Sequence, residues 1–228
     1  MRALKGESCV VDDMELHRPE RTVALQVWGT PVVHATDGVQ YAIAAFTDIT
    51  KRKSAERALL EKERQAQERA LRDDLTGLHN RRGLLHVAET LFELGIRAER
   101  SLSVVYIDLD DVKAINDKHG HQQGDRALQD VAAILEGNLR ESDFIARLGG
   151  DEFCILLSGG SEAQDRVAIE RIQQAVEHHN STQSRPYSLG LSIGLARSDP
   201  KSPGSVDDLI RAADVGMYRH KASKLGRS

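Results

Sequence analysis

The sequence lacks the features that mark several specialised classes of protein. It contains 2 cysteines, Cys9 and Cys154, so it has neither a disulfide framework nor a thiolate zinc cluster. Its 31 Lys and Arg residues stand against 35 Asp and Glu, and a net charge of -4 is not the basic excess of a non-specific nucleic-acid binder. The longest apolar runs, such as 41–46, fall far short of the roughly 18 residues that predict a membrane span. Residues 1–8 have no apolar stretch of a signal peptide, so we expect a cytoplasmic protein without a nucleic-acid partner.

What remains is the composition of an ordinary folded protein. Hydrophobic residues make up 40% of the 228 and charged residues 29%, a balance that argues against wholesale disorder. The length is enough for one full domain and a smaller additional module. Changes in composition along the chain predict three parts, which span 1–50, 51–72 and 73–228.

The first two parts precede the main domain. Residues 1–50 contain alternating apolar runs, separated by turn-like segments at 29–31 and 37–38, which predict two or three strands. These strands are too few to close a core of their own. Residues 51–72 are rich in Lys, Arg, Glu and Gln and free of Gly and Pro, which predicts a helix. Its apolar seam is weak, so two interpretations stay open: a solvated linker, or a parallel dimerising helix that transmits a signal.

The third part alternates helix and strand patterns. The apolar runs at 102–107 and 153–157 are typical of buried strands, and a further strand is expected at 187–196. Apolar residues over 128–139 recur with the helical period. These patterns predict one α/β domain of the α+β kind over 73–228.

An apolar strand that ends in two carboxylates is the first chemically distinctive feature of this domain. Asp108 and Asp110 follow the run at 104–107, and side chains two apart on a strand share a face. Hard cations such as Mg²⁺ take oxygen ligands and are held by one or two carboxylates together with substrate phosphates. For such a pair taken alone, a solvated position facing a loop is an equally good interpretation.

A second pair of carboxylates follows two glycines. Gly149-Gly150 between two apolar runs predicts a two-residue hairpin turn, and glycine lets a ligand approach the backbone closely. Asp151 and Glu152 come directly after it, and adjacent anions repel unless a cation neutralises them. A surface turn with charged edges explains this motif alone, but not its combination with the acidic strand end.

Polar residues after the acidic strand suit a nucleotide. Lys113 is close enough to reach a phosphate, and the backbone amides near Val112 could also cradle one. Asn116 and Asp125 offer an amide and a carboxylate, which match the donors and acceptors of a guanine edge. Each residue also has an ordinary interpretation: Asn116 as a turn residue, Asp125 as a helix cap, and His121 as a surface histidine.

Together these motifs resemble the signature of the GGDEF-domain diguanylate cyclases. The resemblance covers 73–228 in the family's order and rests on Asp108-Leu109-Asp110, Lys113, Ile115-Asn116-Asp117, Gly120-His121, Gly124-Asp125 and the heptapeptide RLGGDEF at 147–153. Further matches are 74–82 near the start, 192–196 in a later strand, and Ala213-Asp214, Met217-Tyr218 and Lys221 in the last helix. Residues 1–50 resemble part of a PAS sensor module, namely its C-terminal strands.

The resemblance implies a fold and a reaction. The fold would be a nucleotidyl-cyclase palm, a central and mainly antiparallel sheet with flanking helices. The reaction would join two GTP molecules into cyclic di-GMP and release two pyrophosphates, with two Mg²⁺ ions in each active site and Mn²⁺ as a substitute. Because each domain would present one GTP, the active species would be a homodimer.

The resemblance also assigns roles to the acidic residues. Asp108 and Asp151 would bind Mg²⁺, with help from the main-chain carbonyl of Leu109. Glu152 would be a further metal ligand or the proton acceptor, and Asp151 is a rival for the second role. Neither the resemblance nor the residues themselves separate these two roles.

The remaining assignments concern the nucleotide and the product. Phosphates would be contacted by Lys113 and Lys221, with Lys113 also stabilising the transition state. The residues expected to bind the rest of the substrate are Asn116, His121, Asp125, Gly149 and Gly150. Arg140 and Asp143 match the family's RxxD site, at which bound cyclic di-GMP inhibits the enzyme.

Two departures from the family pattern bear on function. After Lys221 the spacing to Gly226-Arg227 is longer than usual, so Lys224 and Arg227 are both candidates for a phosphate-contacting residue. The PAS-like part lacks a first half, which is typical of a fragment of a longer sensor whose upstream residues could tether it to a membrane. A different class of function also stays open: an inactive module that binds cyclic di-GMP or GTP as a receptor or scaffold. Such modules usually carry damage at the Gly-Gly-Asp-Glu turn or at the metal-binding aspartate, and this sequence carries none.

Overall fold

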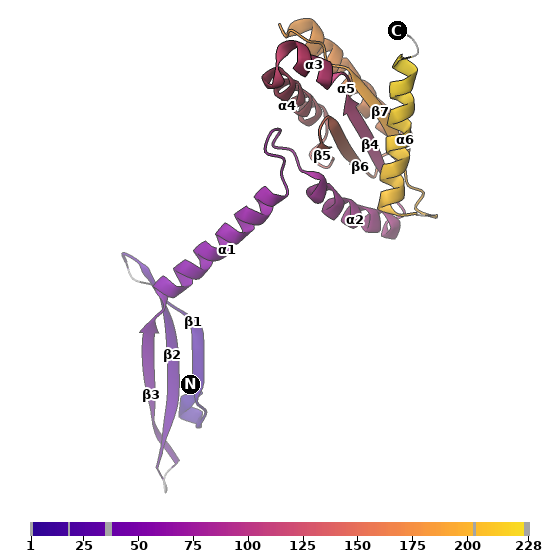
Figure 1. Cartoon of the computed structure of the whole chain (residues 1–228). Coiled ribbons are helices and arrows are strands. Elements are labelled where there is room, and N and C mark those ends of the chain that lie inside the picture. The colour runs from indigo at the N-terminus through magenta and orange to yellow at the C-terminus, as the bar shows by residue number, and fades with distance from the viewer. Residues whose placement is uncertain (1, 18, 35–37, 203, 226–228) are drawn as a thin grey trace. The chain divides into compact units, whose positions relative to one another are not determined.

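The structure of the chain is a computed structural model. Its described residues are 2–17, 19–34, 38–202 and 204–225 (Figure 1). They divide into two compact units, Met1–Arg69 and Ala70–Ser228, each with its own sheet. Among the described residues no helix combines the length and the apolar character that crossing a bilayer requires.

The N-terminal unit is a three-stranded antiparallel sheet followed by a helix, as the sequence patterns predict. Its elements, in chain order, are η1 (Ala3–Lys5), β1 (Cys9–His17), β2 (Thr22–His34), β3 (Gly38–Asp48) and α1 (Thr50–Ala70). The strands pair in the order β1-β2-β3. The described apolar side chains that are buried in this unit are Ala3, Val23 and Ile49, whereas Tyr41 and Phe46 of β3 are exposed.

The prediction of a turn at 29–31 is wrong. Gly29 lies inside β2, where it pairs with Cys9 of β1. A Cβ atom at Gly29 would lie 3.0 Å from the sulfur of Cys9 and 3.2 Å from the Cβ atom of Ala3. The glycine therefore makes room for η1 against the sheet and does not reverse the chain. The other expected turn includes Asp37, which lies outside the described residues.

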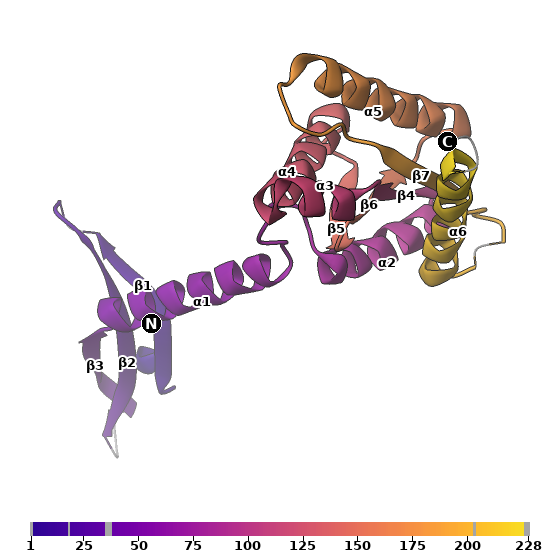
Figure 2. The same cartoon turned by 45° about the horizontal axis from the view of Figure 1, so that its top comes forward.

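The C-terminal unit is a four-stranded antiparallel sheet with helices on both faces (Figure 2). Its strands are β4 (Leu102–Leu109), β5 (Phe144–Gly149), β6 (Glu152–Ser158) and β7 (Leu191–Arg197), in the spatial order β5-β6-β4-β7. Its helices are α2 (Arg81–Arg97), α3 (Val112–His119), α4 (His121–Asn138), α5 (Glu162–Thr182) and α6 (Val206–Leu225). This architecture confirms the predicted α/β fold with a mainly antiparallel central sheet and flanking helices.

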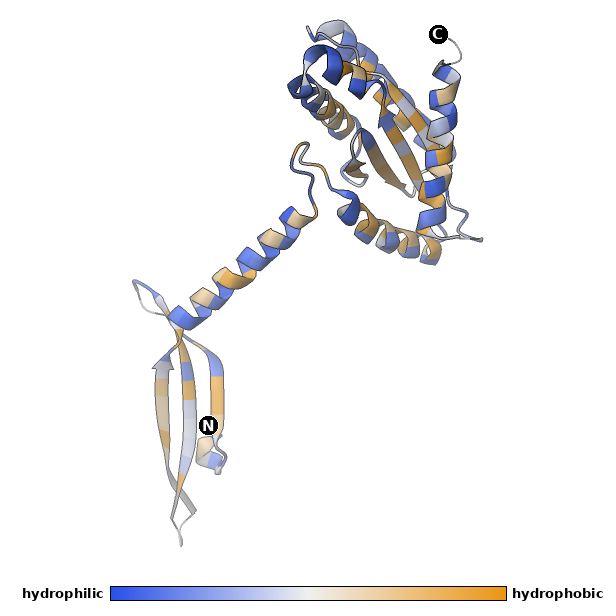
Figure 3. Ribbon diagram, viewed as in Figure 1, coloured by the Kyte–Doolittle hydropathy of each residue, from blue (hydrophilic) through white to orange (hydrophobic). Residues whose placement is uncertain are grey.

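The central strand β4 explains why the sheet is covered on both sides. All 8 of its residues are buried, and its side chains alternate between two hydrophobic cores. Val105 and Ile107 pack in the core that contains residues of α3, α4 and α5, whereas Val104 and Tyr106 pack in the core with α2 and α6. Figure 3 shows how strongly apolar these strands are. The burial of both faces leaves the ends of β4 as the places where its polar groups can meet a ligand.

The helix α6 is pressed closely against β7. A Cβ atom at Gly194 of β7 would lie 2.0 Å from the carbonyl oxygen of Ala213 and 2.2 Å from the amide nitrogen of Met217. Gly216 faces this point from the helix, and a Cβ atom there would lie 3.4 Å from the Cα atom of Gly194. The close backbone approach sets the height of α6 above the sheet and thereby the position of its last turn.

Candidate active site

The candidate site lies at the end of β4, where neighbouring strands and α6 bring polar side chains together. Asp108 of β4 pairs with Glu152 of β6 on one side and with Ser192 of β7 on the other. Asp108 is 7% exposed, and Lys221 of α6 donates a hydrogen bond of 2.6 Å to its Oδ1. The hydroxyl of Tyr106, on the same face of β4, is hydrogen-bonded to Glu152. The structure thus brings the predicted residues Asp108, Glu152 and Lys221 together.

The turn between β5 and β6 differs by one residue from the sequence-based prediction. Gly149 still belongs to the ladder and pairs with Glu152, so the turn residues are Gly150 and Asp151 and not Gly149 and Gly150. The φ angles of Gly149 and Gly150 are +142° and +55°, a range that favours glycine. The amide of Leu109 donates to the carbonyl of Asp151 at 2.9 Å, which ties this turn to the end of β4.

Arg147 fastens the same turn to the segment that opens the domain. Its guanidinium donates to the carbonyl of Gly150 at 2.7 Å and to the carboxylate of Asp73 at 3.0 Å. Burial alone would raise the pKa of Asp73, but hydrogen bonds from Thr76 and Arg147 outweigh this effect and the pKa is lowered. The ionised Asp73 therefore holds Arg147, and Arg147 holds the turn that carries Asp151.

Asp110 has different partners from Asp108, although both carboxylates belong to the end of one strand. Ser192 donates to its Oδ1 at 2.6 Å, and Lys224 donates to its Oδ2 at 2.8 Å. Its own amide donates to the carbonyl of Gly190 at 2.8 Å. Both carboxylate oxygens of Asp110 are therefore engaged by the protein, which makes Asp110 part of the frame of the site.

Burial and neighbouring anions disfavour ionised carboxylates at this end of the sheet. Burial raises the pKa of Asp108; the hydrogen bond from Lys221 opposes this effect and the charge of Asp151 adds to it. Burial likewise raises the pKa of Glu152, against the hydrogen bond from Tyr106. The hydrogen bond to Asp108 raises the pKa of Lys221. A cation bound beside these buried carboxylates would stabilise their ionised form.

The donor set fits a hard divalent cation that arrives with a nucleotide. Over the described residues, no group of three or more His, Cys, Asp or Glu side chains is arranged to hold a metal ion by itself. Mg²⁺, however, usually takes one or two protein carboxylates and completes its shell with phosphates and water. Asp108 and Glu152 occupy paired positions on adjacent strands, and the backbones of Leu109 and Asp151 are joined beside them. These groups provide carboxylate and carbonyl oxygens, the kind of ligand that a hard divalent cation takes.

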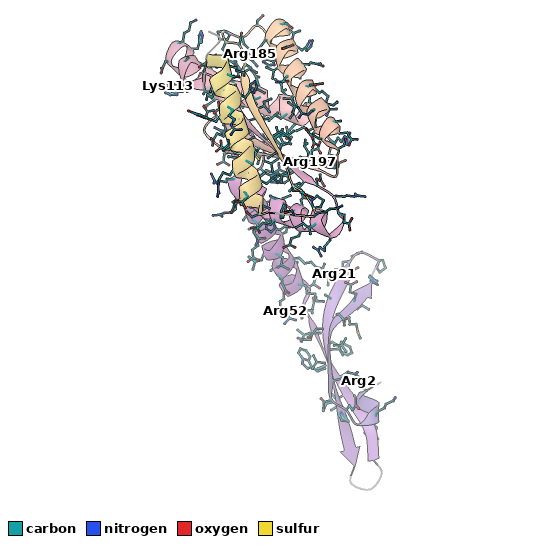
Figure 4. All side chains as sticks on the ribbon, turned by 90° about the vertical axis from the view of Figure 1, so that its right-hand side faces the viewer. Arg2, Arg21, Arg52, Lys113, Arg185 and Arg197 are labelled. Carbon is teal, nitrogen blue, oxygen red and sulfur yellow. The ribbon has the colours of Figure 1, made fainter. Side chains whose placement is uncertain are left out.

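The residues expected to bind guanine lie on α3 and α4. The side chain of Asn116 packs on Gly124, where a Cβ atom would lie only 2.0 Å from its Oδ1. Asp125 follows Gly124 directly and is exposed, so the side chain of Asn116 lies against the residue that precedes Asp125. Lys113 and His121 are exposed in the first turns of α3 and α4 (Lys113 is labelled in Figure 4). Lys113 and Asn116 lie three residues apart and therefore share a face of α3.

Replacing Gly124 with Ala is expected to leave α4 at least as stable while weakening guanine-nucleotide binding about ten-fold. Alanine is the better helix former, but its Cβ atom would displace the amide of Asn116 from its place against Gly124. Calorimetric titration with a GTP analogue and thermal melting would measure the two effects. Gly137→Ala is the control on the same helix, because a Cβ atom there meets nothing within 4 Å. Unchanged affinity in Gly124→Ala would remove Asn116 from the binding site.

Arg140 and Asp143 line a separate pocket of about 210 Å³ at the start of α5. The amide of Arg140 donates to the carboxylate of Asp143 at 3.0 Å, and Arg171 adds a second guanidinium to the lining. Asp165 in the pocket wall accepts a 2.6 Å hydrogen bond from Arg197 of β7, a residue that Figure 4 labels. The two predicted residues are thus brought together, and none of the described acidic residues at the end of β4 lines this pocket.

Several residues of the site are not evident from sequence. Tyr106 has a usable signal, because the two-residue period of a strand places it on the face of Asp108. Ser192 has none, and although the sequence makes Lys224 a candidate for a phosphate contact, its ion pair with Asp110 depends on which helix lies beside β4. Arg227, the other expected candidate for a phosphate contact, lies outside the described residues.

Comparison with known proteins identifies the family. Residues 70–227, well over half of the chain, match the family model described as "Diguanylate cyclase, GGDEF domain". This chain belongs to the GGDEF diguanylate cyclase family. GGDEF cyclases generally use divalent metals, in agreement with the carboxylates at the end of β4.

Individual GGDEF proteins give the same result. The chain is 31% identical over 229 residues to diguanylate cyclase DgcP of Escherichia coli K12, covering 90% of this chain and 67% of that protein. Diguanylate cyclase SiaD of Pseudomonas aeruginosa, solved with its activator SiaC, is 29% identical with a TM-score of 0.64, over 77% of this chain and 67% of that one. The GGDEF domain of DgcB from Caulobacter crescentus, solved with c-di-GMP, is 25% identical with a TM-score of 0.62, over 68% of this chain and 91% of that one. The chain spans 67%, 23% and 45% of the first three curated relatives that it matches.

Proposed function

We propose that this GGDEF domain is an active cytoplasmic diguanylate cyclase, which condenses two GTP molecules into cyclic di-GMP and releases two pyrophosphates. The observation that carries the proposal is the pairing of Asp108 with Glu152 beside an intact Gly-Gly-Asp-Glu turn. Burial raises the pKa of both carboxylates, so holding them in their ionised form at this position costs stability. A module that only recognised the product would gain nothing from that cost.

In this proposal, side chains from three helices bind and orient GTP. Asn116 and Asp125 hydrogen-bond the guanine edge, and Lys113 lies one turn before Asn116 on α3, in reach of the phosphates. Lys221 contacts the phosphates from α6. Because the net charge is -4, the protein as a whole does not attract a polyanion, and capture depends on these local cations.

The acidic residues hold the metal and prepare the nucleophile. Asp108, Asp151 and the carbonyl of Leu109 are the proposed ligands of Mg²⁺, for which Mn²⁺ is a chemical substitute. Two bound Mg²⁺ ions would lower the pKa of the 3′-hydroxyl of GTP and neutralise the negative charge of the leaving pyrophosphate. In this scheme Lys221, which donates to Asp108 at 2.6 Å, exchanges this carboxylate for the phosphates when GTP binds.

Glu152 is the proposed acceptor of the proton from the 3′-hydroxyl. Burial raises its pKa, which brings its basicity closer to neutral pH. The hydroxyl of Tyr106 hydrogen-bonds the same carboxylate and fixes its orientation. Asp151, whose carbonyl is tied to the amide of Leu109, is assigned to metal binding in this scheme.

The raised pKa values predict how activity depends on pH. Asp108 and Glu152 act as anions, and burial makes them take up protons at a higher pH than ordinary carboxylates. Activity is therefore full above this range and is lost as the pH falls through it. The acid limb of kcat/KM for GTP, which reports on the free enzyme, is expected above the pH range of surface carboxylates. An acid limb within the ordinary carboxylate range would contradict the assignment.

Catalysis by this scheme requires two domains, because each presents one GTP and the two must meet face to face. The described residues of α1 include none that is buried, and Leu59 and Leu60 are 58% and 59% exposed. Exposed leucines on a helix that leads into the catalytic domain support pairing of two copies through α1. The active species is therefore proposed to be a homodimer.

Product feedback is assigned to the pocket of Arg140 and Asp143. Arginine offers a planar fork that suits phosphate or a guanine edge, and Asp143 can accept from guanine. Arg140→Ala is expected to weaken inhibition by added cyclic di-GMP at least ten-fold with little change in the initial rate. Initial rates measured across a product titration would show this, with exposed Arg211→Ala as the control. Unchanged inhibition would place the regulatory site elsewhere.

The proposed function is tested by incubating the chain with GTP and Mg²⁺ and separating the nucleotides by chromatography. Cyclic di-GMP and pyrophosphate are expected in a 1:2 ratio, and their formation should stop when EDTA removes the metal. ATP in place of GTP should give little product, because the guanine-binding residues would lose their partners. Binding of cyclic di-GMP without turnover of GTP would favour the receptor instead, a function that the pocket of Arg140 and Asp143 could serve alone.

A further inference from the structure

Two lysines on one side of α6 fasten its last turn to the sheet. Lys221 and Lys224 are three residues apart, a spacing that places them on the same face of the helix. Lys221 donates to Asp108 at 2.6 Å, and Lys224 donates to Asp110 at 2.8 Å. Lys224 also donates to the carbonyl of Leu191, the first residue of β7, at 2.6 Å. The end of α6, which lies over β4 and β7 in Figure 2, is therefore joined to both strands.

The two ion pairs differ in the surroundings of their carboxylates. Asp108 belongs to the proposed metal site, so its pair with Lys221 has to open when substrate binds. Asp110 has an additional partner instead: Ser192 donates to its other oxygen at 2.6 Å. A Cβ atom at Gly190 would lie 2.9 Å from its Oδ2, so backbone packs directly against this carboxylate. The pair of Asp110 with Lys224 can therefore stay closed while the pair beside it opens.

We propose that Lys224 is a positioning residue for Lys221, a role that rests on the proposed function of the same site. Its ion pair with Asp110 keeps the last turn of α6 in place while Lys221 exchanges Asp108 for the phosphates of GTP. Without this anchor the helix end frays, and Lys221 is no longer presented from a fixed position. The role differs from direct contact of Lys224 with a phosphate, which the sequence alone leaves open.

The two roles predict opposite results for Asp110→Asn. In the positioning role, Asp110→Asn removes the ion pair that anchors Lys224 and therefore weakens nucleotide binding, although the bond of Lys224 to the carbonyl of Leu191 stays. In the direct role, Asp110→Asn removes an anion that competes with the phosphates for Lys224, so binding stays the same or improves. Asparagine retains an oxygen that can accept from Ser192, which keeps the local frame.

The experiment is a calorimetric titration of the full chain with a non-hydrolysable GTP analogue and Mg²⁺. Lys224→Met and Asp110→Asn are each expected to weaken binding about five-fold, the effect of one partly exposed ion pair. Lys224→Arg should bind like the wild type, and Lys201→Met, at an exposed lysine outside the site, is the control for loss of a positive charge. With GTP as substrate, KM should rise by the same factor in Lys224→Met while kcat changes less than two-fold.

The double variant Lys221→Met/Lys224→Met separates an indirect from a direct effect. If Lys224 acts through Lys221, the double variant binds the analogue no more weakly than Lys221→Met alone. The proposal would be overturned if the losses of affinity in Lys221→Met and Lys224→Met multiplied in the double variant, or if Asp110→Asn bound the analogue as tightly as the wild type does. Either result would leave the proposed function intact. A wild-type chain that does not bind the analogue would contradict the proposed function and this role together.

Discussion

Glu152→Gln is expected to lower kcat for GTP about a thousand-fold and, without nucleotide, to make the domain more stable. Glutamine keeps the shape of the side chain and can still accept the hydrogen bond from Tyr106, but it neither accepts a proton nor neutralises a metal ion. The stabilisation follows from the raised pKa of Glu152, because burial and the neighbouring anions penalise the ionised form. Removing that penalty should raise the free energy of unfolding.

Two measurements check this trade between stability and activity. Nucleotide chromatography gives the turnover, and urea unfolding without metal or nucleotide gives the stability. Glu136→Gln is the matched control, because Glu136 is an exposed residue of α4 and its loss should change neither quantity. Turnover within ten-fold of the wild type would exclude Glu152 as the proton acceptor, and a destabilised variant would contradict the electrostatic account.

Gly194→Ala is expected to destabilise the C-terminal unit by about 3–5 kcal/mol. The new Cβ atom would lie 2.0 Å from the carbonyl oxygen of Ala213 and 2.2 Å from the amide nitrogen of Met217. Both are backbone atoms, so no side chain can rotate away and α6 has to move off the sheet. Because α6 also carries Lys221, the fraction that stays folded should bind nucleotide poorly.

Urea unfolding curves of the wild type and Gly194→Ala would measure the effect. Gly137→Ala is the control, because the space around Gly137 is open and α4 should tolerate the change or gain from it. A loss of less than 1 kcal/mol in Gly194→Ala would mean that α6 and β7 do not approach as closely as the structure shows.

The fold and part of the site are predictable from the sequence because they depend on local patterns. The apolar run that becomes β4 is buried over its whole length, and the helical period over 128–139 coincides with the second half of α4, which ends one residue earlier at Asn138. The strand expected at 187–196 is observed as β7, over Leu191–Arg197, because the residues before it form a connecting segment that ends at Gly190. The acidic residues at 108 and 152 are brought together because β4 and β6 are adjacent and antiparallel.

The rest of the site depends on contacts between distant segments. Lys221 and Asp108 are 113 positions apart in the sequence, and only the order of the strands and the packing of α6 on the sheet bring them together. The same is true of Lys224 and Asp110. The wrong prediction of a turn at 29–31 has a different cause: glycine and proline two positions apart are typical of a turn, but here Gly29 lies inside a strand and allows close packing against η1.

The central claim is that acidic residues from adjacent strands hold the metal on which GTP reacts. A crystal structure of the chain with Mg²⁺ and a non-hydrolysable GTP analogue tests this claim most directly. We expect a cation bound by Asp108 together with the carboxylates of the turn, and Lys221 moved from Asp108 to the phosphates. Carboxylates that lie apart with no cation between them, and Lys221 still paired with Asp108 beside a bound nucleotide, would contradict the account.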